Sequence, residues 1–265
     1  MRILFIGDIM GKPGRKAVVA LLPSLREEYA PDIVIANAEN LAHGKGVTEK
    51  TLSEIVSAGV DFCTSGNHIW SKNEVTDLLS GSKSILLRPA NYPVQNAGRG
   101  YALVSIGSRQ LLIINLMGRV LMKEHLSCPF RALDEILEAV KHTNIAGIFV
   151  DFHAEATSEK NVFGLYADGR VSAVVGTHTH VQTSDNQILP KGTAYITDVG
   201  MVGLKYSSVG INYEGILPSF LYQTPPKHEI ADSGPVGFHA VVIDIDPDTK
   251  RATAIERIQK DIEVQ

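Results

Sequence analysis

Residues 2–8 read Arg-Ile-Leu-Phe-Ile-Gly-Asp, an apolar run that stops at a glycine and an aspartate. A short, unbroken run of this kind predicts a buried strand over 2–6, with Asp8 just beyond its carboxyl end. The following segments alternate in type, with apolar residues at helical spacing over 15–29, a strand over 32–36, a helix over 48–58 and a strand over 60–64. Thr48 and Thr51 resemble a capping box at the start of the second helix. Strands and helices in this order predict βαβ units and a largely parallel sheet.

The second half of the chain predicts more strands and helices. Segments 101–106 and 110–115 flank Gly107-Ser108-Arg109, which is typical of a hairpin that joins two strands. The remaining predicted elements are helices over 130–141 and 158–167 and strands over 146–152, 171–175, 193–197, 238–245 and 252–258. No internal repeat, low-complexity tract or linker divides the sequence, so residues 1–265 are expected to form a single domain.

The composition is that of an ordinary globular protein, with 44% hydrophobic and 20% charged residues. A net charge of −4 and a pI of about 6.1 give no basic surface for a long nucleic acid, although a small anionic substrate can still bind through a metal. Cys63 and Cys128 form no CxxC pair, which favours a reducing compartment. No apolar run approaches the length of a membrane span, so we expect a cytoplasmic protein without membrane contacts. A homo-oligomer is compatible with this composition.

Polar residues follow the predicted strands at the points where the strands end. The six residues in such positions are Asp8, Glu39, Asn67, His153, His178 and His180. The carboxyl ends of strands in an open α/β sheet form one rim, where ligands bind. Six oxygen and imidazole groups are too many for one tetrahedral ion and too rich in oxygen for structural zinc. They suit two ions of the iron, manganese or zinc type that share a carboxylate.

Each of these residues, taken alone, also has a simpler explanation. Asp8 resembles a turn or cap residue, Gly66-Asn67 is a common turn dipeptide, and His153 alone is more typical of a core histidine. The pair His178-Thr179-His180 is more specific, because side chains two residues apart on a strand share a face. The joint pattern therefore carries the metal-site prediction.

The same pattern resembles the metallophosphoesterase superfamily, whose motifs run GDxH, GDxxD, GNH, a lone histidine after a strand, and GHxH. The corresponding segments here are Gly7-Asp8-Ile9-Met10, Asn37-Ala38-Glu39-Asn40, Gly66-Asn67-His68, His153 and Thr177-His178-Thr179-His180. Met10 stands in place of the first-motif histidine, and Glu39 in place of the bridging aspartate. These departures, with the segments 88–93 (Arg-Pro-Ala-Asn-Tyr-Pro) and 197–201 (Thr-Asp-Val-Gly-Met), are similar to the YmdB-like bacterial family of metal-dependent phosphodiesterases.

The resemblance implies a fold and a set of metal ligands. The fold would be a layered α/β sandwich with mixed β-sheets flanked by helices. Two metal ions per chain would be bound, iron ahead of manganese or zinc, with Glu39 as the bridge. Asp8 and His180 would complete one site, and Asn67, His153 and His178 the other. Met10 would leave the first ion one protein group short, and Asn40 or water would fill that position.

The resemblance also implies an activity, the hydrolysis of cyclic nucleotides and particularly of 2′,3′-cyclic ones. A hydroxide held between the two ions would attack phosphorus, because such a pair lowers the pKa of water from 15.7 towards about 7. His68, whose ordinary pKa is about 6.5, would protonate the leaving oxygen or stabilise the phosphoryl group. Asn40 and His68 are the predicted substrate contacts, and Arg88, His43 and Tyr206 are further candidates for the pocket.

Other functions remain open on the sequence alone. A P-loop hydrolase is disfavoured, because only three residues separate Gly7 from Gly11 and Pro13 occupies the Ser/Thr position. A phosphomonoesterase or phosphoprotein phosphatase would use the same metal pair. A metal-bound regulatory or scaffold protein with weak or no turnover is the non-enzymatic alternative. The Asn67-His68 pair argues against it, because a structural site has no use for a spare imidazole, and the missing first-motif histidine favours it slightly.

Overall fold

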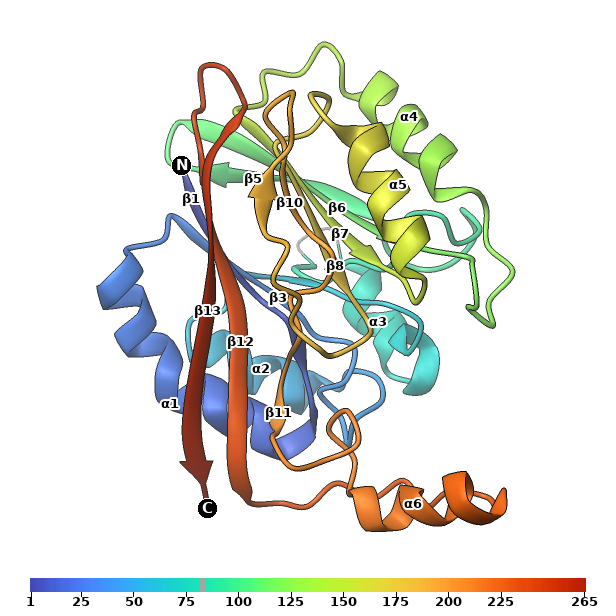
Figure 1. The fold of residues 1–265 in the computed structure, drawn as a ribbon. Coiled ribbons are helices and arrows are strands. Elements are labelled where there is room, and N and C mark those ends of the chain that lie inside the picture. Colours follow the sequence, from blue (N-terminus) through green and yellow to red (C-terminus); the bar gives the residue numbers. More distant parts are fainter. Residues whose placement is uncertain (82–83) are drawn as a thin grey trace.

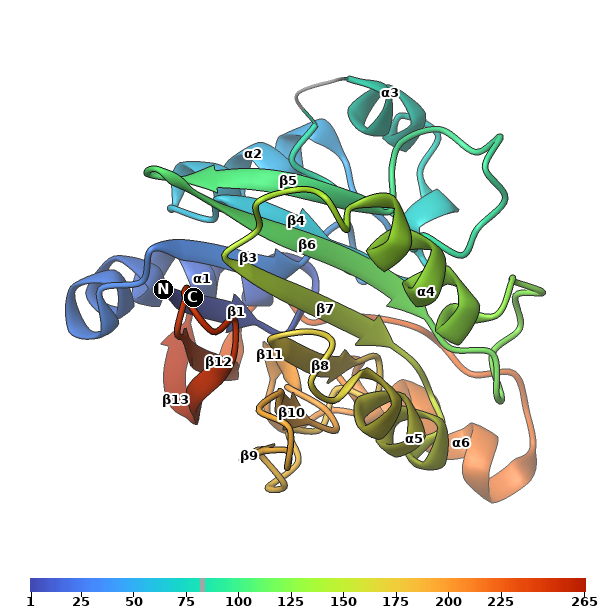
Figure 2. The ribbon, with the colours of Figure 1, turned by 90° about the horizontal axis from the view of Figure 1, so that it is seen from above.

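The computed structural model describes residues 1–81 and 84–265, and it consists of two β-sheets stacked face to face between two layers of helices (Figures 1 and 2). Strand β1 (Arg2–Ile6) shows how the sequence sets these layers. Ile3 and Phe5 point into the core between the sheets, whereas Leu4 and Ile6 point into the core under the helices. The apolar run is continuous because both faces of the strand are buried. Phe5 also packs on Phe149 of the opposite sheet, with ring centroids 5.2 Å apart.

The first sheet has seven strands and mixed direction. Its strand order is β2 (Asp8–Ile9), β11 (Met201–Leu204), β12 (Gly234–Ile245), β1, β3 (Ile33–Asn37) and β4 (Phe62–Thr64), with β13 (Ala252–Val264) paired to β12. Strands β1, β3 and β4 are parallel, so their carboxyl ends share one edge. Strand β12 runs antiparallel to β1, which makes the sheet mixed.

The second sheet has six strands and contributes to the same edge. Its order is β5 (Tyr101–Ile106), β6 (Arg109–Met117), β7 (Gly147–His153), β8 (Ala173–Thr177), β10 (Ala194–Ile196) and β9 (Gln187–Ile188). Strands β6, β7 and β8 are parallel, and β5 forms the predicted hairpin with β6.

Helices cover the two outer faces. Helices α1 (Gly11–Tyr29) and α2 (Glu49–Ser57) lie on the first sheet, and α4 (Pro129–Ala139) and α5 (Thr157–Ala167) on the second (Figures 1 and 2). The shorter elements are the 3₁₀ helix η1 (Ile69–Ser71), α3 (Val75–Ser80) and α6 (Tyr213–Tyr222), and α6 projects from the body (Figure 1). In the part of the chain that the structure describes, no helix combines the length and apolar character needed to cross a bilayer.

The predicted fold class is confirmed, and the differences are local. The capping box at Thr48 and Thr51 is present. The prediction of a largely parallel sheet was too simple, because the long C-terminal strands β12 and β13 join the first sheet in antiparallel pairing. Helix α1 begins at Gly11 instead of residue 15. The sequence pattern also showed no sign of α3, α6, β2, β9 and β11, most of which are too short to establish a hydrophobic period.

Candidate metal centre

The predicted ligands lie along the edge where the parallel strands of both sheets end. Asp8 follows β1, Glu39 follows β3, and Asn67 follows β4. His153 is the last residue of β7, and His178 comes directly after β8. Two sheets stacked with their carboxyl ends at one edge thus bring residues that are far apart in the sequence into one buried cluster.

One half of this cluster is centred on the ring of His153. Its Nε2 atom lies 3.0 Å from Asn67 Oδ1, 3.3 Å from Glu39 Oε1 and 3.1 Å from His178 Nδ1. The donor atoms of Glu39, His153 and His178 all lie within 4.8 Å of one another. Imidazole nitrogen and carboxylate oxygen are the ligands that iron, manganese and zinc accept, so this half fits one such cation.

The other half contains buried oxygen atoms that lack hydrogen-bond partners. Asp8 Oδ1 and Asn40 Oδ1 have no partner among the described residues, and both side chains are buried. A buried polar atom without a partner costs about 1–3 kcal/mol, and a cation would remove that cost. His180 is partly exposed. Its Nδ1 lies 2.9 Å from the carbonyl oxygen of Val209, so Nε2 is the ring nitrogen available to bind a metal ion. The chemistry of this half therefore also fits a metal ion.

Burial and neighbouring charges shift the pKa of each predicted ligand and so set whether that side chain is charged or neutral. Burial raises the pKa of Asp8 above its ordinary value. Burial also opposes the ionisation of Glu39, but the charge and hydrogen bond of His153 outweigh it and lower its pKa to about 2. Glu39 in turn outweighs the effect of burial on His153 and raises its pKa to about 9. Burial and the neighbouring His153 lower the pKa of His178 to about 3, so its ring is neutral.

A buried polar network, which the sequence did not predict, lies behind His153. Thr177 Oγ1 donates a hydrogen bond of 2.7 Å to Asp151 and lies 2.9 Å from His153 Nδ1. Because the hydroxyl hydrogen points to Asp151, the oxygen accepts the proton of His153 Nδ1, so Nε2 is the nitrogen that faces the other predicted ligands and that a cation would occupy in place of its proton. Thr64 and Asn37 donate to the other oxygen of Asp151 at 2.5 and 3.0 Å. The network thus fixes the orientation of the His153 ring.

His178 has an orienting carboxylate of its own. Its Nε2 lies 3.0 Å from Glu155 Oε2, while its Nδ1 faces His153. Glu155 follows His153 by two residues in the sequence, but nothing in its type or spacing distinguished it from a surface glutamate.

The loop that carries His178 and His180 corrects one argument made from the sequence. Strand β8 ends at Thr177, so the two histidines do not share the face of a strand. Both have left-handed backbones, with φ of 96° and 64°. The loop is held by Asp198, which accepts hydrogen bonds from Thr179 and forms a buried ion pair of 2.7 Å with Lys160. Strain of this kind persists only where surrounding contacts fix it.

Gly66 is required at this edge because there is no room for a side chain. A Cβ atom at this position would lie 2.2 Å from His153 Nε2 and 2.4 Å from Glu39 Oε2. Gly66 therefore does not serve only to form a turn. Because it has no side chain, the backbone can pass directly beside the ligand atoms of Glu39 and His153.

His68 and Met10 also lie next to the cluster. The backbone N–H of His68 donates to Glu39 Oε2 at 3.0 Å, and burial lowers the pKa of its ring below the ordinary value. Met10 is buried and lies against Gly44 and Gly210, so it fills space beside the site.

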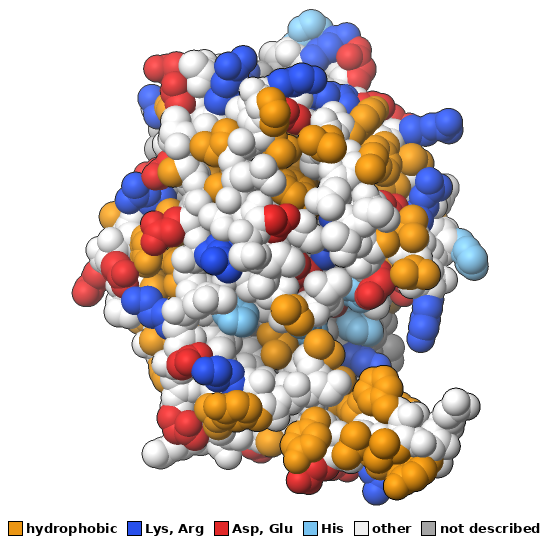
Figure 3. All heavy atoms as spheres, in the orientation of Figure 1, with side chains coloured by type: hydrophobic (Ala, Val, Ile, Leu, Met, Phe, Trp, Pro, Cys, Tyr) orange, Lys and Arg blue, Asp and Glu red, His pale blue; other side chains and the backbone are white. Residues whose placement is uncertain are grey.

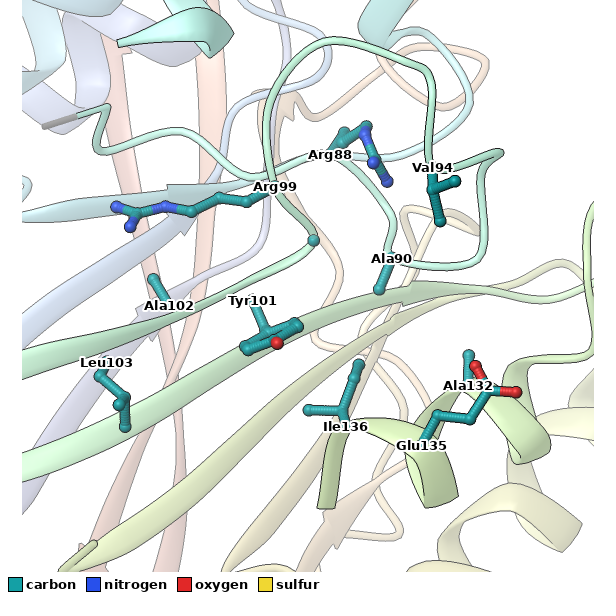
Figure 4. Close-up of a pocket in the computed structure, with 11 residues that line it drawn as sticks. Arg88, Ala90, Val94, Arg99, Tyr101, Ala102, Leu103, Ala132, Glu135 and Ile136 are labelled. Carbon is teal, nitrogen blue, oxygen red and sulfur yellow. The ribbon is translucent and has the colours of Figure 1, made fainter. Parts of the chain in front are cut away.

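Of the three further pocket candidates, Arg88 lies at a cavity away from the predicted ligands. Its volume is about 650 Å³, and Figure 4 shows it between β5 and α4 with Tyr101 and Ile136 in its wall. This cavity includes none of the predicted metal ligands, and the Arg88 guanidinium donates to the carbonyl groups of Pro89 and Ala97. His43 and Tyr206 are exposed.

A smaller cavity borders the cluster of predicted ligands at His180. Its volume is about 340 Å³, and Met201 and Val209 form part of its wall. Gln182 and His239 also border it, and each has a buried polar atom without a hydrogen-bond partner among the described residues, Gln182 Oε1 and His239 Nδ1. The cavity has room for part of a small polar ligand beside the predicted metal ligands.

Comparison with known proteins identifies the family of this chain. The family described as YmdB-like protein matches residues 4–258. The 2′,3′-cyclic-nucleotide 2′-phosphodiesterase of Bacillus subtilis (strain 168) is 50% identical over 259 residues, which cover 97% of this chain and 96% of that protein.

Two crystal structures share the fold over the whole chain. A hypothetical protein from Thermus thermophilus has a TM-score of 0.91 and 43% identity, and the match covers 100% of both chains. A novel phosphatase from Mycoplasma pneumoniae has a TM-score of 0.92 and 34% identity, and the match covers 100% of this chain and 94% of the other. Together with the edge cluster, these similarities show that the chain is an enzyme of the phosphoesterase class and a member of the YmdB-like family.

Proposed function

We propose that this enzyme hydrolyses the phosphodiester bond of cyclic nucleotides, with 2′,3′-cyclic nucleotides as the preferred class. The observation that carries the proposal is the convergence of Glu39, Asn67 and His178 on Nε2 of His153 at the shared edge of the sheets. The substrate class is supported by the activity for which the Bacillus subtilis relative is named, at 50% identity. Residues 1–265 act as one catalytic domain, because both sheets supply parts of the cluster.

The proposed cofactor is a pair of divalent cations, with iron first and manganese or zinc as alternatives. Glu39 would lie between them. Asn67, His153 and His178 would hold one cation, and Asp8, Asn40 and His180 the other. When bound, such a pair lowers the pKa of water and offsets the negative charge of the phosphoryl group. The orphan oxygens of Asp8 and Asn40 support the second position.

His68 is the proposed catalytic residue, because it is anchored to the bridging carboxylate but is not needed as a ligand. Its lowered pKa keeps the ring neutral at neutral pH, and a neutral imidazole still has one N–H to donate. That N–H would donate a hydrogen bond to the ribose oxygen that leaves phosphorus and stabilise the negative charge that develops there, while the proton that this oxygen takes up would come from water. Asn40 is the second proposed substrate contact.

The nucleoside would occupy the cavity beside His180. Met201 and Val209 offer apolar contacts there, and Gln182 and His239 offer polar atoms that lack partners among the described residues. The predicted cytoplasmic location also belongs to this proposal, and it is supported by the two free thiols of Cys63 and Cys128.

One experiment tests these assignments together. Metal content per chain and hydrolysis of 2′,3′-cyclic AMP, bis-p-nitrophenyl phosphate and p-nitrophenyl phosphate are measured for the wild type, His68→Ala and His239→Ala. We expect roughly two metals in all three proteins, a fall of about 10²–10⁴-fold in kcat for His68→Ala on both diesters, and a higher KM of His239→Ala for the cyclic nucleotide alone.

Other outcomes point to different functions. Faster hydrolysis of the monoester than of the diesters would favour a phosphomonoesterase. Full metal content without turnover of any substrate would favour the regulatory or scaffold protein. One metal or none in the wild type, with no turnover after manganese or iron is added, would refute the two-metal centre.

A further inference from the structure

Helix α6 exposes an unusually large apolar surface. Its sequence is Tyr-Glu-Gly-Ile-Leu-Pro-Ser-Phe-Leu-Tyr, and Ile216 is its only buried residue. Figures 1 and 3 show the helix projecting from the body, with hydrophobic side chains gathered at that end of the molecule. The α6 surface consists of Tyr206 (78% exposed), Tyr213 (52%), Leu217 (44%), Phe220 (78%), Leu221 (60%) and Tyr222 (72%).

The helix is held in a defined position at its base. Asn212 caps it by accepting the N–H of Glu214, and the returning chain is tied to it by the hydrogen bond from Lys227 N to the carbonyl oxygen of Gly215, 3.0 Å long. A salt bridge of 2.9 Å between Lys12 and Asp232 fastens the end of this segment to α1. A helix of this length is only marginally stable in water by itself, so a projecting apolar helix needs a packing partner.

The exposed area is large enough for a specific interface between two copies. An aromatic side chain presents roughly 150–250 Å² when fully exposed, so the four aromatic residues of the α6 surface offer roughly 550 Å². The same surface on a second copy brings the total to roughly 1,100 Å², which reaches the size of a biological interface before the leucines are counted. Contiguous apolar patches of this size on soluble proteins mark interaction sites.

The charges around the helix favour a second copy over a lipid surface. Helices that lie in a membrane interface carry Lys and Arg on their polar side. Here α6 has no Lys or Arg and Glu214 is its only charged residue. The returning segment carries one lysine, Lys227, against the two acidic residues Glu229 and Asp232, and the whole chain carries a net charge of −4. We propose that the α6 surface pairs with the same surface of a second copy of this chain, around a two-fold axis.

The test is sedimentation equilibrium of the wild type and two matched variants. Leu221→Glu places a charge in the α6 surface, and Leu165→Glu places the same charge on α5, where the leucine is equally exposed at 60%. We expect the wild type and Leu165→Glu to have the mass of a dimer or an even multiple of the chain. Leu221→Glu should dissociate into smaller species and bind its partner roughly a hundredfold more weakly, as for the loss of a central interface residue.

Three results would overturn the proposal. The first is a monomeric wild type at high micromolar concentration. The second is equal association of Leu221→Glu and Leu165→Glu, with circular dichroism showing that both are folded. The third is a monomeric wild type that binds phosphatidylglycerol vesicles, which would assign the α6 surface to a membrane. A Phe220→Glu variant repeats the test at a second position on the same surface.

Discussion

The hydroxyl of Thr177 connects the ring of His153 to the buried carboxylate of Asp151, with contacts of 2.9 and 2.7 Å. The substitution Thr177→Val replaces this hydroxyl with a methyl group of nearly the same shape. His153 Nδ1 then loses its hydrogen-bond acceptor, and the ring is no longer fixed with Nε2 towards Glu39. Asp151 loses one donor and keeps those from Thr64 and Asn37.

Two separate effects are expected from this change, one on metal affinity and one on stability. Loss of a group that orients a histidine ligand lowers metal affinity by about 10–100-fold. A buried polar group left without its partner lowers the free energy of unfolding by about 1–3 kcal/mol. The protein should therefore fold, but its metal-free form should bind Mn²⁺ clearly more weakly.

The assay pairs calorimetric titration of the metal-free protein with Mn²⁺ and unfolding in urea. Thr64→Val is the matched control, because it removes another hydroxyl donor from Asp151 without touching His153. It should lose a similar amount of stability and keep a metal affinity close to that of the wild type. If both variants lose the same metal affinity, or Thr177→Val binds as the wild type does, the hydroxyl does not orient the ligand.

Two further substitutions probe the frame of the site. Lys160→Met leaves Asp198 buried without its ion-pair partner. The free energy of unfolding, measured in urea, should fall by about 3–5 kcal/mol. Unchanged stability would show that the ion pair contributes little. Gly66→Ala places a Cβ atom 2.2 Å from His153 Nε2, so the purified protein should be folded but depleted of metal, and a normal metal content would contradict the packing argument.

The positions of the predicted ligands could be predicted from the sequence because the ends of the strands can be recognised in it. Apolar runs mark the strands, and parallel strands deliver whatever follows them to one edge. Asp8, Glu39 and Asn67 follow three such runs, and the structure puts them at the expected edge. The predicted geometry of the His178–His180 pair was wrong because it assumed strand conformation for both residues, whereas β8 ends at Thr177 and both histidines have left-handed backbones.

The supporting network could not be assembled from the sequence, because its members come from four separate segments. Thr64, Thr177 and Asn37 end their strands and resemble ordinary polar termini. Asp151 did give a signal, since a carboxylate inside the run Phe149–Val150–Asp151–Phe152 must be either paired or neutral when buried. Helix α6 was not predicted for a different reason. Apolar residues lie on nearly all of its sides, so its hydrophobicity does not vary with the period of a helix.

The two halves of the cluster differ in what they do before a cation binds. Around His153, the ligand atoms satisfy one another, with Asn67, Glu39 and His178 all within 3.3 Å of Nε2. Around Asp8, the buried oxygens of Asp8 and Asn40 have no partner among the described residues, and burial raises the pKa of Asp8. A cation bound by the first half would therefore replace existing contacts, whereas one bound by the second would supply contacts that it lacks. Because a ligand that binds only the folded chain stabilises it, we expect the Asp8 half to gain more stability from the proposed cation, even with Met10 in the place of a ligand.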